Sequence, residues 1–197
     1  KEVVVFFLGY LYDKDPQVQA DALKALAEFQ DRRLISIFLP FLGNPDPRVR
    51  GAACIALYPF ARSREKVREA AMSVIEQLAN SPDPAEKLAG FEAIGATRLN
   101  AYQNLLQNHL RSQDKSLAWA AASALAQLKD PSFLQPYLIL MQDEDEGFAV
   151  EVGKRIVDFP TWSRKKFFSQ VEALQEVPRA KVQNRLRKTH QDFSHDW

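Results

Sequence analysis

Apolar and small residues recur along the chain in five segments of similar pattern, and each segment begins with an aspartate. Counted from that aspartate, apolar or small residues stand three, seven and eleven positions on, with Glu86 as the departure at the first of these positions. This spacing places them on one stripe of a helix. The intervals between the leading aspartates are 31, 37, 31 and 31 residues, a period typical of helical arrays. The five leading aspartates are Asp15, Asp46, Asp83, Asp114 and Asp145.

Further segments of helical period lie between these five, so each unit is predicted to be two antiparallel helices joined by a short turn. These segments are KEVVVFFLGYLY from Lys1, LISIFLPFL from Leu34, VREAAMSVIEQL from Val67, AYQNLLQNHL from Ala101 and FLQPYLILM from Phe133. The β-branched opening of the first would by itself suggest a strand, but its place in the register predicts a helix. The leading aspartates are predicted N-caps. Helices are expected to kink or end early at Pro40, Pro59 and Pro136.

Paired helices with a DPxVR-type turn resemble HEAT repeats, specifically the HEAT-like repeats also found in phycobiliprotein lyases. The resemblance covers roughly residues 1–159 and is strongest in NPDPRVRGAACIAL from Asn44. In the family, an Asp in the turn and an Arg directly after the valine form polar ladders between repeats. The corresponding turn positions here are Asp13, Asn44, Ser81, Ser112 and Asp143, and the basic positions are Gln19, Arg50, Lys87, Ala118 and Ala149. Because only Arg50 and Lys87 keep the charge, we expect a broken ladder and stacking by apolar packing.

The resemblance implies an all-α fold, a right-handed α-solenoid of about six antiparallel helix pairs. We expect one domain over residues 1–197, since the chain has only seven glycines and 46% apolar residues. The expected repeats are residues 1–30, 31–62, 63–98, 99–129 and 130–159. Residues 160–197 are expected to form a C-terminal cap, with Phe167 or Phe168, Val171, Leu174, Val182, Leu186 and Phe193 on its apolar faces.

The resemblance further implies that the second helices line a concave face, where a protein partner would bind. Charged residues expected on this face are Arg48, Arg50, Glu92 and Lys154. Leu88, Trp119 and Val150 fall at one register position in successive units and are expected to add an apolar strip. An exposed Trp119 would be a typical hot spot of a protein interface. The alternative is that Trp119 packs between neighbouring helices. A non-enzymatic protein-interaction scaffold is the function predicted first.

The net charge of +1 hides an asymmetry, because residues 154–197 carry 10 basic and 5 acidic side chains. Lys181, Arg185 and Lys188 are expected to form a basic stripe there. One interpretation is the polar outer face that a terminal repeat needs. The alternative function is nucleic-acid binding, with these three residues on the phosphates.

Candidate catalytic chemistry is sparse. His109, His190 and His195 form no zinc-binding pattern, and the sequence holds no Gly-rich phosphate loop, GxSxG or CxxC motif. The acidic run from Asp143 to Glu146 lacks the glycine and terminal glutamate of a calcium loop and is expected to be a solvated turn. We therefore expect no metal and no cofactor. A bilin-lyase-type enzyme, suggested by the repeat resemblance alone, is the third candidate function.

The lone cysteine, Cys54, lies in an apolar helix and is expected to be a buried small hydrophobe. No stretch approaches the ~20 apolar residues of a transmembrane helix, and no signal-like segment is expected. These features predict a cytoplasmic protein. The chain begins at Lys1 without a methionine, which leaves open that it is a domain of a larger protein.

Overall fold

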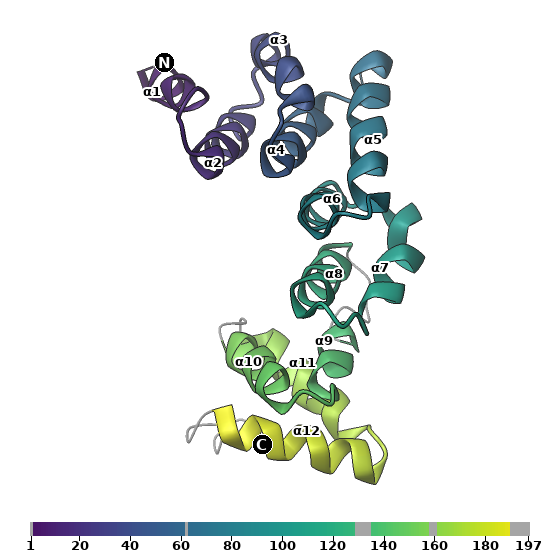
Figure 1. The fold of residues 1–197 in the computed structure, drawn as a ribbon. Helices are drawn as coiled ribbons and strands as arrows, with labels where there is room; N and C mark the ends of the chain where they lie inside the picture. The colour runs from purple at the N-terminus through teal and green to yellow at the C-terminus, as the bar shows by residue number, and fades with distance from the viewer. Residues whose placement is uncertain (1, 62, 129–134, 158–160, 190–197) are drawn as a thin grey trace. The chain divides into compact units, whose positions relative to one another are not determined.

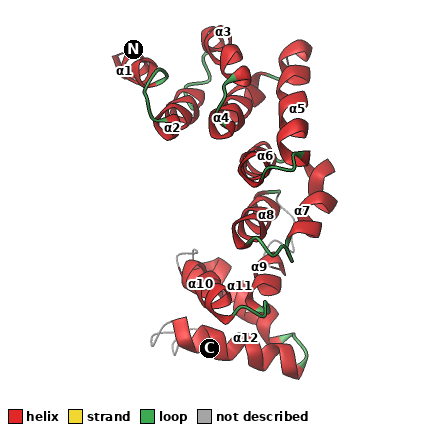
Figure 2. Cartoon of the chain, in the orientation of Figure 1, coloured by secondary structure: helices red, strands yellow, loops and turns green. Residues whose placement is uncertain are grey.

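The computed structural model describes residues 2–61, 63–128, 135–157 and 161–189. Within these ranges it contains twelve α-helices, four short 3-10 helices and no strand (Figures 1 and 2). The predicted all-α helical-repeat class is confirmed. The chain divides into two compact units, Lys1–Leu99 and Asn100–Trp197. That residues 1–197 form a single domain stays a prediction.

Unit 1 consists of three helix pairs. Figure 1 shows the second helix of each pair along one side of the unit and the first helices along the other. The second helices pack directly against one another in sequence order, as the repeat pattern predicts. The pairs are α1 (Glu2–Tyr10) with α2 (Pro16–Ala27), α3 (Ile35–Phe38) with α4 (Pro47–Leu57), and α5 (Glu65–Asn80) with α6 (Pro84–Thr97). The helix predicted for the VVVFF segment is confirmed by α1.

Unit 2 also consists of three pairs. They are α7 (Gln103–His109) with α8 (Lys115–Gln127), α9 (Gln135–Met141) with α10 (Glu146–Val157), and α11 (Thr161–Glu172) with α12 (Glu176–Thr189). Helix α10 packs against both α9 and α12. The predicted apolar faces of the last pair are buried at Phe167, Phe168, Val171, Val182 and Leu186, and Leu174 is half-buried. Phe193 lies outside the described residues.

The leading aspartates cap the second helices, as predicted. In the first four units a carboxylate oxygen accepts a hydrogen bond from the backbone N–H two residues on, at 2.8 to 2.9 Å. Asp145 accepts from the N–H of Phe148 at 3.0 Å. The turn residue two positions before each aspartate in turn accepts from the aspartate's own N–H, at 2.9 to 3.2 Å. These paired caps satisfy N–H groups at the helix start that have no partner within the helix.

Two of the three prolines interrupt helices as predicted. Helix α3 ends at Phe38, and Pro40 lies in the 3-10 helix Leu39–Gly43 that follows it. Helix α4 ends at Leu57, directly before the 3-10 helix Tyr58–Phe60 that contains Pro59. Pro136, by contrast, is the second residue of α9, where a missing N–H is tolerated. The predicted start of that segment at Phe133 lies outside the described residues.

Small residues set the distance between neighbouring helices in unit 1. A Cβ atom added to Gly90 on α6 would lie 2.6 Å from the backbone nitrogen of Ala79 and 2.8 Å from its Cα, at the end of α5. Glycine is therefore required at this position of closest approach. Larger apolar residues complete the core at the eleventh position of each unit, where exposure is 4% or less for Leu26, Leu57, Ile94, Leu125 and Ile156.

Candidate protein-interaction surface

The side chains of α2, α4 and α6 that point away from the first helices form the second-helix face of unit 1. Beneath the charged side chains of this face lies a floor of small residues, among them Ala52 and Ala89, which are only 1% and 4% exposed. A Cβ on Gly51 would lie 3.0 Å from the carbonyl oxygen of Ala89, so α4 and α6 are in close contact. Long charged side chains on this floor can reach from one helix to the next.

An ion pair crosses the second-helix face from its first helix to its third. Lys24 Nζ on α2 binds the carboxylate of Glu92 on α6. The pair therefore passes over α4, which packs against both helices. Ile55 stands at the same register position on α4 and is half-buried. The two charged side chains remain 32% and 52% exposed. Glu92 therefore lies on the predicted face, where it is held in place by Lys24.

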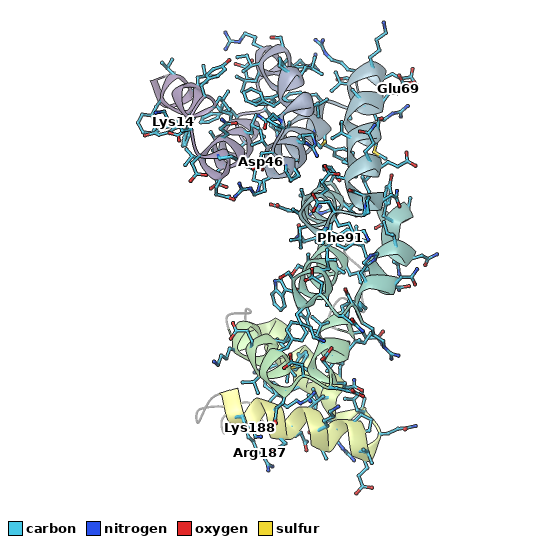
Figure 3. The ribbon with its side chains drawn as sticks, viewed as in Figure 1. Lys14, Asp46, Glu69, Phe91, Arg187 and Lys188 are labelled. Atoms are coloured by element: carbon cyan, nitrogen blue, oxygen red, sulfur yellow. The ribbon has the colours of Figure 1, made fainter. Side chains whose placement is uncertain are left out.

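A second ion pair lies at the start of α4. Arg48 donates from Nε to Asp46 Oδ1 at 3.0 Å and from Nη2 to Oδ2 at 2.8 Å, a bidentate contact. The hydrogen bond from this guanidinium holds the pKa of Asp46 below its ordinary value. Asp46 lies at the N-terminal end of α4 (Figure 3), and the Arg48 side chain is 49% exposed. Arg48 thus remains accessible to a partner while its orientation is fixed.

A continuous polar ladder connects the three repeats of unit 1, and the prediction of a broken ladder is wrong for this unit. Gln19 donates to the carbonyl oxygen of Asp13 and accepts from Asn44 Nδ2 at 3.3 Å. Arg50 donates to the Asn44 carbonyl at 2.9 Å and to Glu86 Oε1 at 2.6 Å. An amide at residue 19 can both donate and accept, so it replaces the guanidinium of the family pattern.

Glu86 ends this ladder and explains the one departure from the apolar pattern. Its pKa lies below the ordinary value, first because the Ser81 hydroxyl hydrogen-bonds to the carboxylate and then because Arg50 does. Arg50 is only 17% exposed in its side chain and also donates to the carbonyl of Pro45 at 3.0 Å. Among the predicted partner-binding residues, Arg50 is therefore engaged in stacking the repeats.

In unit 2 the acidic run of residues 143–146 is used for contacts within the chain. Lys115 Nζ donates to both carboxylate oxygens of Asp143 at 2.8 Å, and it lies 5.3 Å from the ring centroid of Phe148. Burial raises the pKa of Asp143, but the hydrogen bonds from Lys115 and from the Asp145 backbone outweigh it and leave the pKa below its ordinary value. Glu146 binds Lys188, which lowers its pKa.

Trp119 lies on α8 against α9. Its ring centroid is 5.5 Å from that of Tyr137, at an interplanar angle of 54°, and the side chain is half-buried. Tyr137 is 5% exposed; burial raises the pKa of its hydroxyl, which is hydrogen-bonded to Ser123. The geometry therefore supports the packing interpretation of Trp119 within unit 2.

The remaining predicted residues of the partner surface divide between the two units. Leu88 is half-buried on α6 in unit 1. Val150 is half-buried on α10 in unit 2, and Lys154 is exposed there, 3.8 Å from Glu151. Leu88, Trp119 and Val150 are thus all partly accessible.

The predicted basic stripe on α12 is not a uniformly exposed row, because Arg185 is 5% exposed. Its Nη1 donates to the carbonyl oxygen of Met141 at the end of α9. Lys181 donates to the next carbonyl oxygen, that of Gln142, at 2.8 Å. Lys188, labelled in Figure 3 beside Arg187, pairs with Glu146. These three side chains bind α12 to the α9–α10 turn, where cations also complement the carbonyl groups at a helix end.

A polar groove of about 450 Å³ lies in unit 2 between the ends of α7 and α9. Side chains of both charge signs line it, among them Arg111, Lys115, Asp143 and Glu144. Because Lys115 and Asp143 are paired with each other, the groove presents no concentrated charge of one sign.

Candidate catalytic groups remain scattered within the described part of the chain. His109 lies 2.9 Å from the carbonyl oxygen of Leu105 through Nδ1, while His190 and His195 fall outside the described residues. Cys54 is buried, and burial raises the pKa of its thiol to about 12. Over the described residues, no three His, Cys, Asp or Glu side chains come together as metal ligands would. None of the helices described there has the length and apolar character to cross a membrane.

Sequence reasoning missed the partners of the charged residues. The repeat pattern identifies Gln19 and Asn44 as ladder positions, but a comparison of charges alone does not reveal that their amide groups can hydrogen-bond to each other. The Lys24–Glu92 pair joins residues 68 positions apart and has no local signal. Their shared register position, nine residues after a leading aspartate, was the one clue.

Three comparisons with known proteins bear on this chain to different extents. Residues 5–72 match the family described as HEAT repeats. No curated protein matches the chain. The crystal structure of an engineered protein matches over 98% of this chain and 97% of its own, with 19% sequence identity and a TM-score of 0.42. The segment matched to the family holds the first two helix pairs with their DPxV turns, so residues 5–72 are similar to HEAT repeats.

Proposed function

We propose that this chain is a non-enzymatic scaffold that binds a protein partner on the second-helix face of unit 1. HEAT repeats generally serve as protein-interaction scaffolds. The observation that carries the proposal is the arrangement of exposed charged side chains that ion pairs fix over a floor of small residues. Lys24, Arg48 and Glu92 are each held in this way yet remain about one third to one half exposed. Side chains oriented before binding lose less conformational entropy when a partner docks.

The charges on this face favour a partner that carries both signs. Two of its residues are acidic, Asp21 and Glu92, and two are basic, Lys24 and Arg48, so both signs occur across the three helices. Complementary charges on a partner would mainly set specificity and association rate. A polyanion such as nucleic acid would meet carboxylates here as often as cations. Leu88, half-buried on α6, would supply an apolar contact beside them.

In unit 2, the corresponding partner contacts would come from Val150 and Lys154 on α10. Trp119 would contribute through the part of its ring that Tyr137 leaves uncovered. These contacts are proposed separately from those of unit 1, because each unit has its own second helices. The nucleic-acid alternative is disfavoured by the contacts that already occupy Lys181, Arg185 and Lys188. No residue of the described chain can be assigned to bilin-lyase chemistry, and a cytoplasmic location stays a prediction.

A charge exchange tests the proposed face without removing an ion pair. The double variant Lys24→Glu with Glu92→Lys keeps opposite charges together but reverses their positions. The matched control, Glu65→Arg with Arg68→Glu, exchanges an exposed pair on α5 whose atoms lie 3.0 Å apart. With a partner isolated by affinity capture in the presence of nuclease, we expect weaker binding for the first double variant alone, in titration calorimetry with purified components. Equal binding by both variants would remove the second-helix face from the interface.

A further inference from the structure

Exposed large apolar side chains are concentrated at the N-terminal edge of unit 1. Apart from Val177, every such side chain in the described residues lies between residues 5 and 39. They are Val5 at 69% exposure, Phe6 at 61%, Tyr10 at 39%, Tyr12 at 78%, Phe29 at 44% and Leu39 at 37%. Phe6 and Tyr10 are four residues apart on α1, with ring centroids 5.1 Å apart, and so form one aromatic ridge. Solvent-exposed aromatic clusters of this kind mark interaction sites.

The repeat register shows that both ridge positions are normally covered. Phe6 stands nine residues before its leading aspartate, and every later unit also has an apolar residue there, half-buried or buried: Ile37, Val74, Leu105 and Pro136. Tyr10 stands five residues before that aspartate. The corresponding residues are Phe41 at 8% exposure, Leu78 at 1%, Leu140 at 0% and the half-buried His109.

A contact within unit 1 indicates what covers these positions in a later repeat. The ring of Phe41 lies 6.1 Å from that of Tyr12, a residue of the preceding helix pair. Phe41 corresponds to Tyr10 in the repeat register. In the second helix pair this position is therefore in contact with the pair before it. Phe29 is likewise more exposed than its counterparts in later repeats. It is 44% exposed, whereas Phe60, Thr97 and Leu128 at the same register position are each 6% exposed.

We propose that the ridge of Phe6 and Tyr10 is a docking surface for one further antiparallel helix pair of the HEAT type. The added pair would pack on α1 and α2 in the same way that α1 and α2 pack on α3 and α4. The proposal extends an interface already present in the chain by one repeat period. It is independent of the partner proposed for the second-helix face.

The test supplies such a helix pair and measures whether it covers the ridge. A second copy of residues 31–62, fused before Lys1, keeps the 31-residue interval between leading aspartates. Amide hydrogen exchange in α1 should slow by about tenfold or more in the extended chain, because a stacked pair suppresses local opening of the terminal helix. The double variant Phe6→Ser with Tyr10→Ser should lose this protection. Val5→Ser should keep it, since the later units have Ser36, Ser73, Asn104 and Gln135 at that position, all exposed.

Three results would overturn the proposal. The first is unchanged exchange of α1 in the extended chain. The second is an added segment that stays unfolded, visible as no gain in helical circular dichroism, because the ridge would then have failed to seat it. The third comes from sedimentation equilibrium of the unextended chain. A dimer that the Phe6→Ser and Tyr10→Ser variant abolishes would identify a second copy of the chain as the occupant instead.

Discussion

Arg50 on α4 and Glu86 on α6 form an ion pair, Nη2 to Oε1 2.6 Å, that joins two consecutive repeats of unit 1. Glu86 occupies a register position that is apolar in the other four repeats. Where the other repeats have an apolar residue, this repeat has the carboxylate of Glu86, and Arg50 on the neighbouring helix supplies the cation that pairs with it. Arg50 also binds two backbone carbonyls of the preceding turn, so one side chain connects a turn, its own helix and the next repeat.

Arg50→Ala should destabilise unit 1 by about 1.5–3 kcal/mol, because it removes hydrogen bonds from a charged donor to the half-buried Asn44 carbonyl and to the exposed Pro45 carbonyl. Arg50→Lys should recover part of this loss, since an ammonium group can keep one or two of the bonds but lacks the planar fork. Urea unfolding followed by circular dichroism measures both. The Arg50→Ala and Glu86→Ala double variant should be less destabilised than the sum of the single variants. Strict additivity would show that the two residues are not coupled.

The ladder should also make stability depend on pH. The Glu86 carboxyl has a lowered pKa in the folded chain, owing first to Ser81 and then to Arg50. Its contribution is therefore present above the unfolded pKa and is lost as the pH falls through the folded one. Between pH 5 and pH 3, roughly the titration range of carboxyl groups, Glu86→Gln should show a shallower loss of thermal stability than the parent chain. Parallel curves for the two proteins would contradict this assignment.

Much of the fold follows from sequence because its determinants are local. Aspartate caps, prolines after them and a stripe of small residues fix where the second helices begin and which side they bury. The surface is different, because the pairs Lys24–Glu92 and Arg50–Glu86 depend on how closely helices approach. Gly51 sets the approach of α4 to α6, and its neighbour Ala89 is known only from the folded chain. Arg185 is expected from sequence in a basic stripe but is buried in the structure. Its partner is the backbone carbonyl of Met141, for which the sequence carries no signal.

Gly90→Ala should destabilise the chain although alanine favours helix. The new methyl group would meet backbone atoms of α5 at 2.6 to 2.9 Å, so the two helices must separate. Overpacking of this kind costs about 1–3 kcal/mol, more than the ~1 kcal/mol that alanine gains in helix propensity. Gly9→Ala on α1 is the matched control, since its new methyl group would meet nothing within 4 Å and should stabilise the chain slightly. Chemical unfolding should give opposite signs; a stabilised Gly90→Ala would refute the close approach.

Cys54 should resist alkylation in the folded protein. The thiol is 0% exposed, and burial raises its pKa to about 12 from an ordinary value of 9.0. The stability gained by keeping it protonated is fully present below the unfolded pKa and is lost as the pH rises toward 12. Iodoacetamide at pH 8, about one unit below that ordinary value, should therefore label the chain rapidly in urea and only through unfolding in buffer. Fast labelling of the folded chain would show that α4 opens locally.

Trp119→Ala should lower the stability of unit 2 by about 2–3 kcal/mol, somewhat less than the ~3–5 kcal/mol typical of a fully buried aromatic residue. The ring packs on Tyr137 at 5.5 Å but is half-buried. Trp119→Phe should retain most of the stability because it keeps an aromatic contact with Tyr137. The two variants also separate packing from binding. A stable Trp119→Ala protein that binds its partner weakly would identify Trp119 as a hot spot instead.

The basic residues of α12 should respond unequally to neutralisation. Arg185→Gln should destabilise unit 2 by about 1.5–3 kcal/mol, because it removes a charged donor from a buried carbonyl. Lys181→Gln and Lys188→Gln should have small effects, since both side chains are exposed. The same variants test the nucleic-acid alternative. Phosphate contacts would give an affinity for duplex DNA that falls with salt, with a slope of about −0.9 for each contact, and the lysine variants would reduce that slope.

We expect no such salt-dependent binding in fluorescence anisotropy at physiological ionic strength, because all three cations already bind the α9–α10 turn. The lysine variants are the decisive ones, since their folding should be intact while their charge is removed. Arg187→Gln provides the control, as it neutralises a neighbouring exposed cation on the same helix. Micromolar or tighter DNA binding that disappears in Lys181→Gln and Lys188→Gln, but persists in Arg187→Gln, would establish the alternative function.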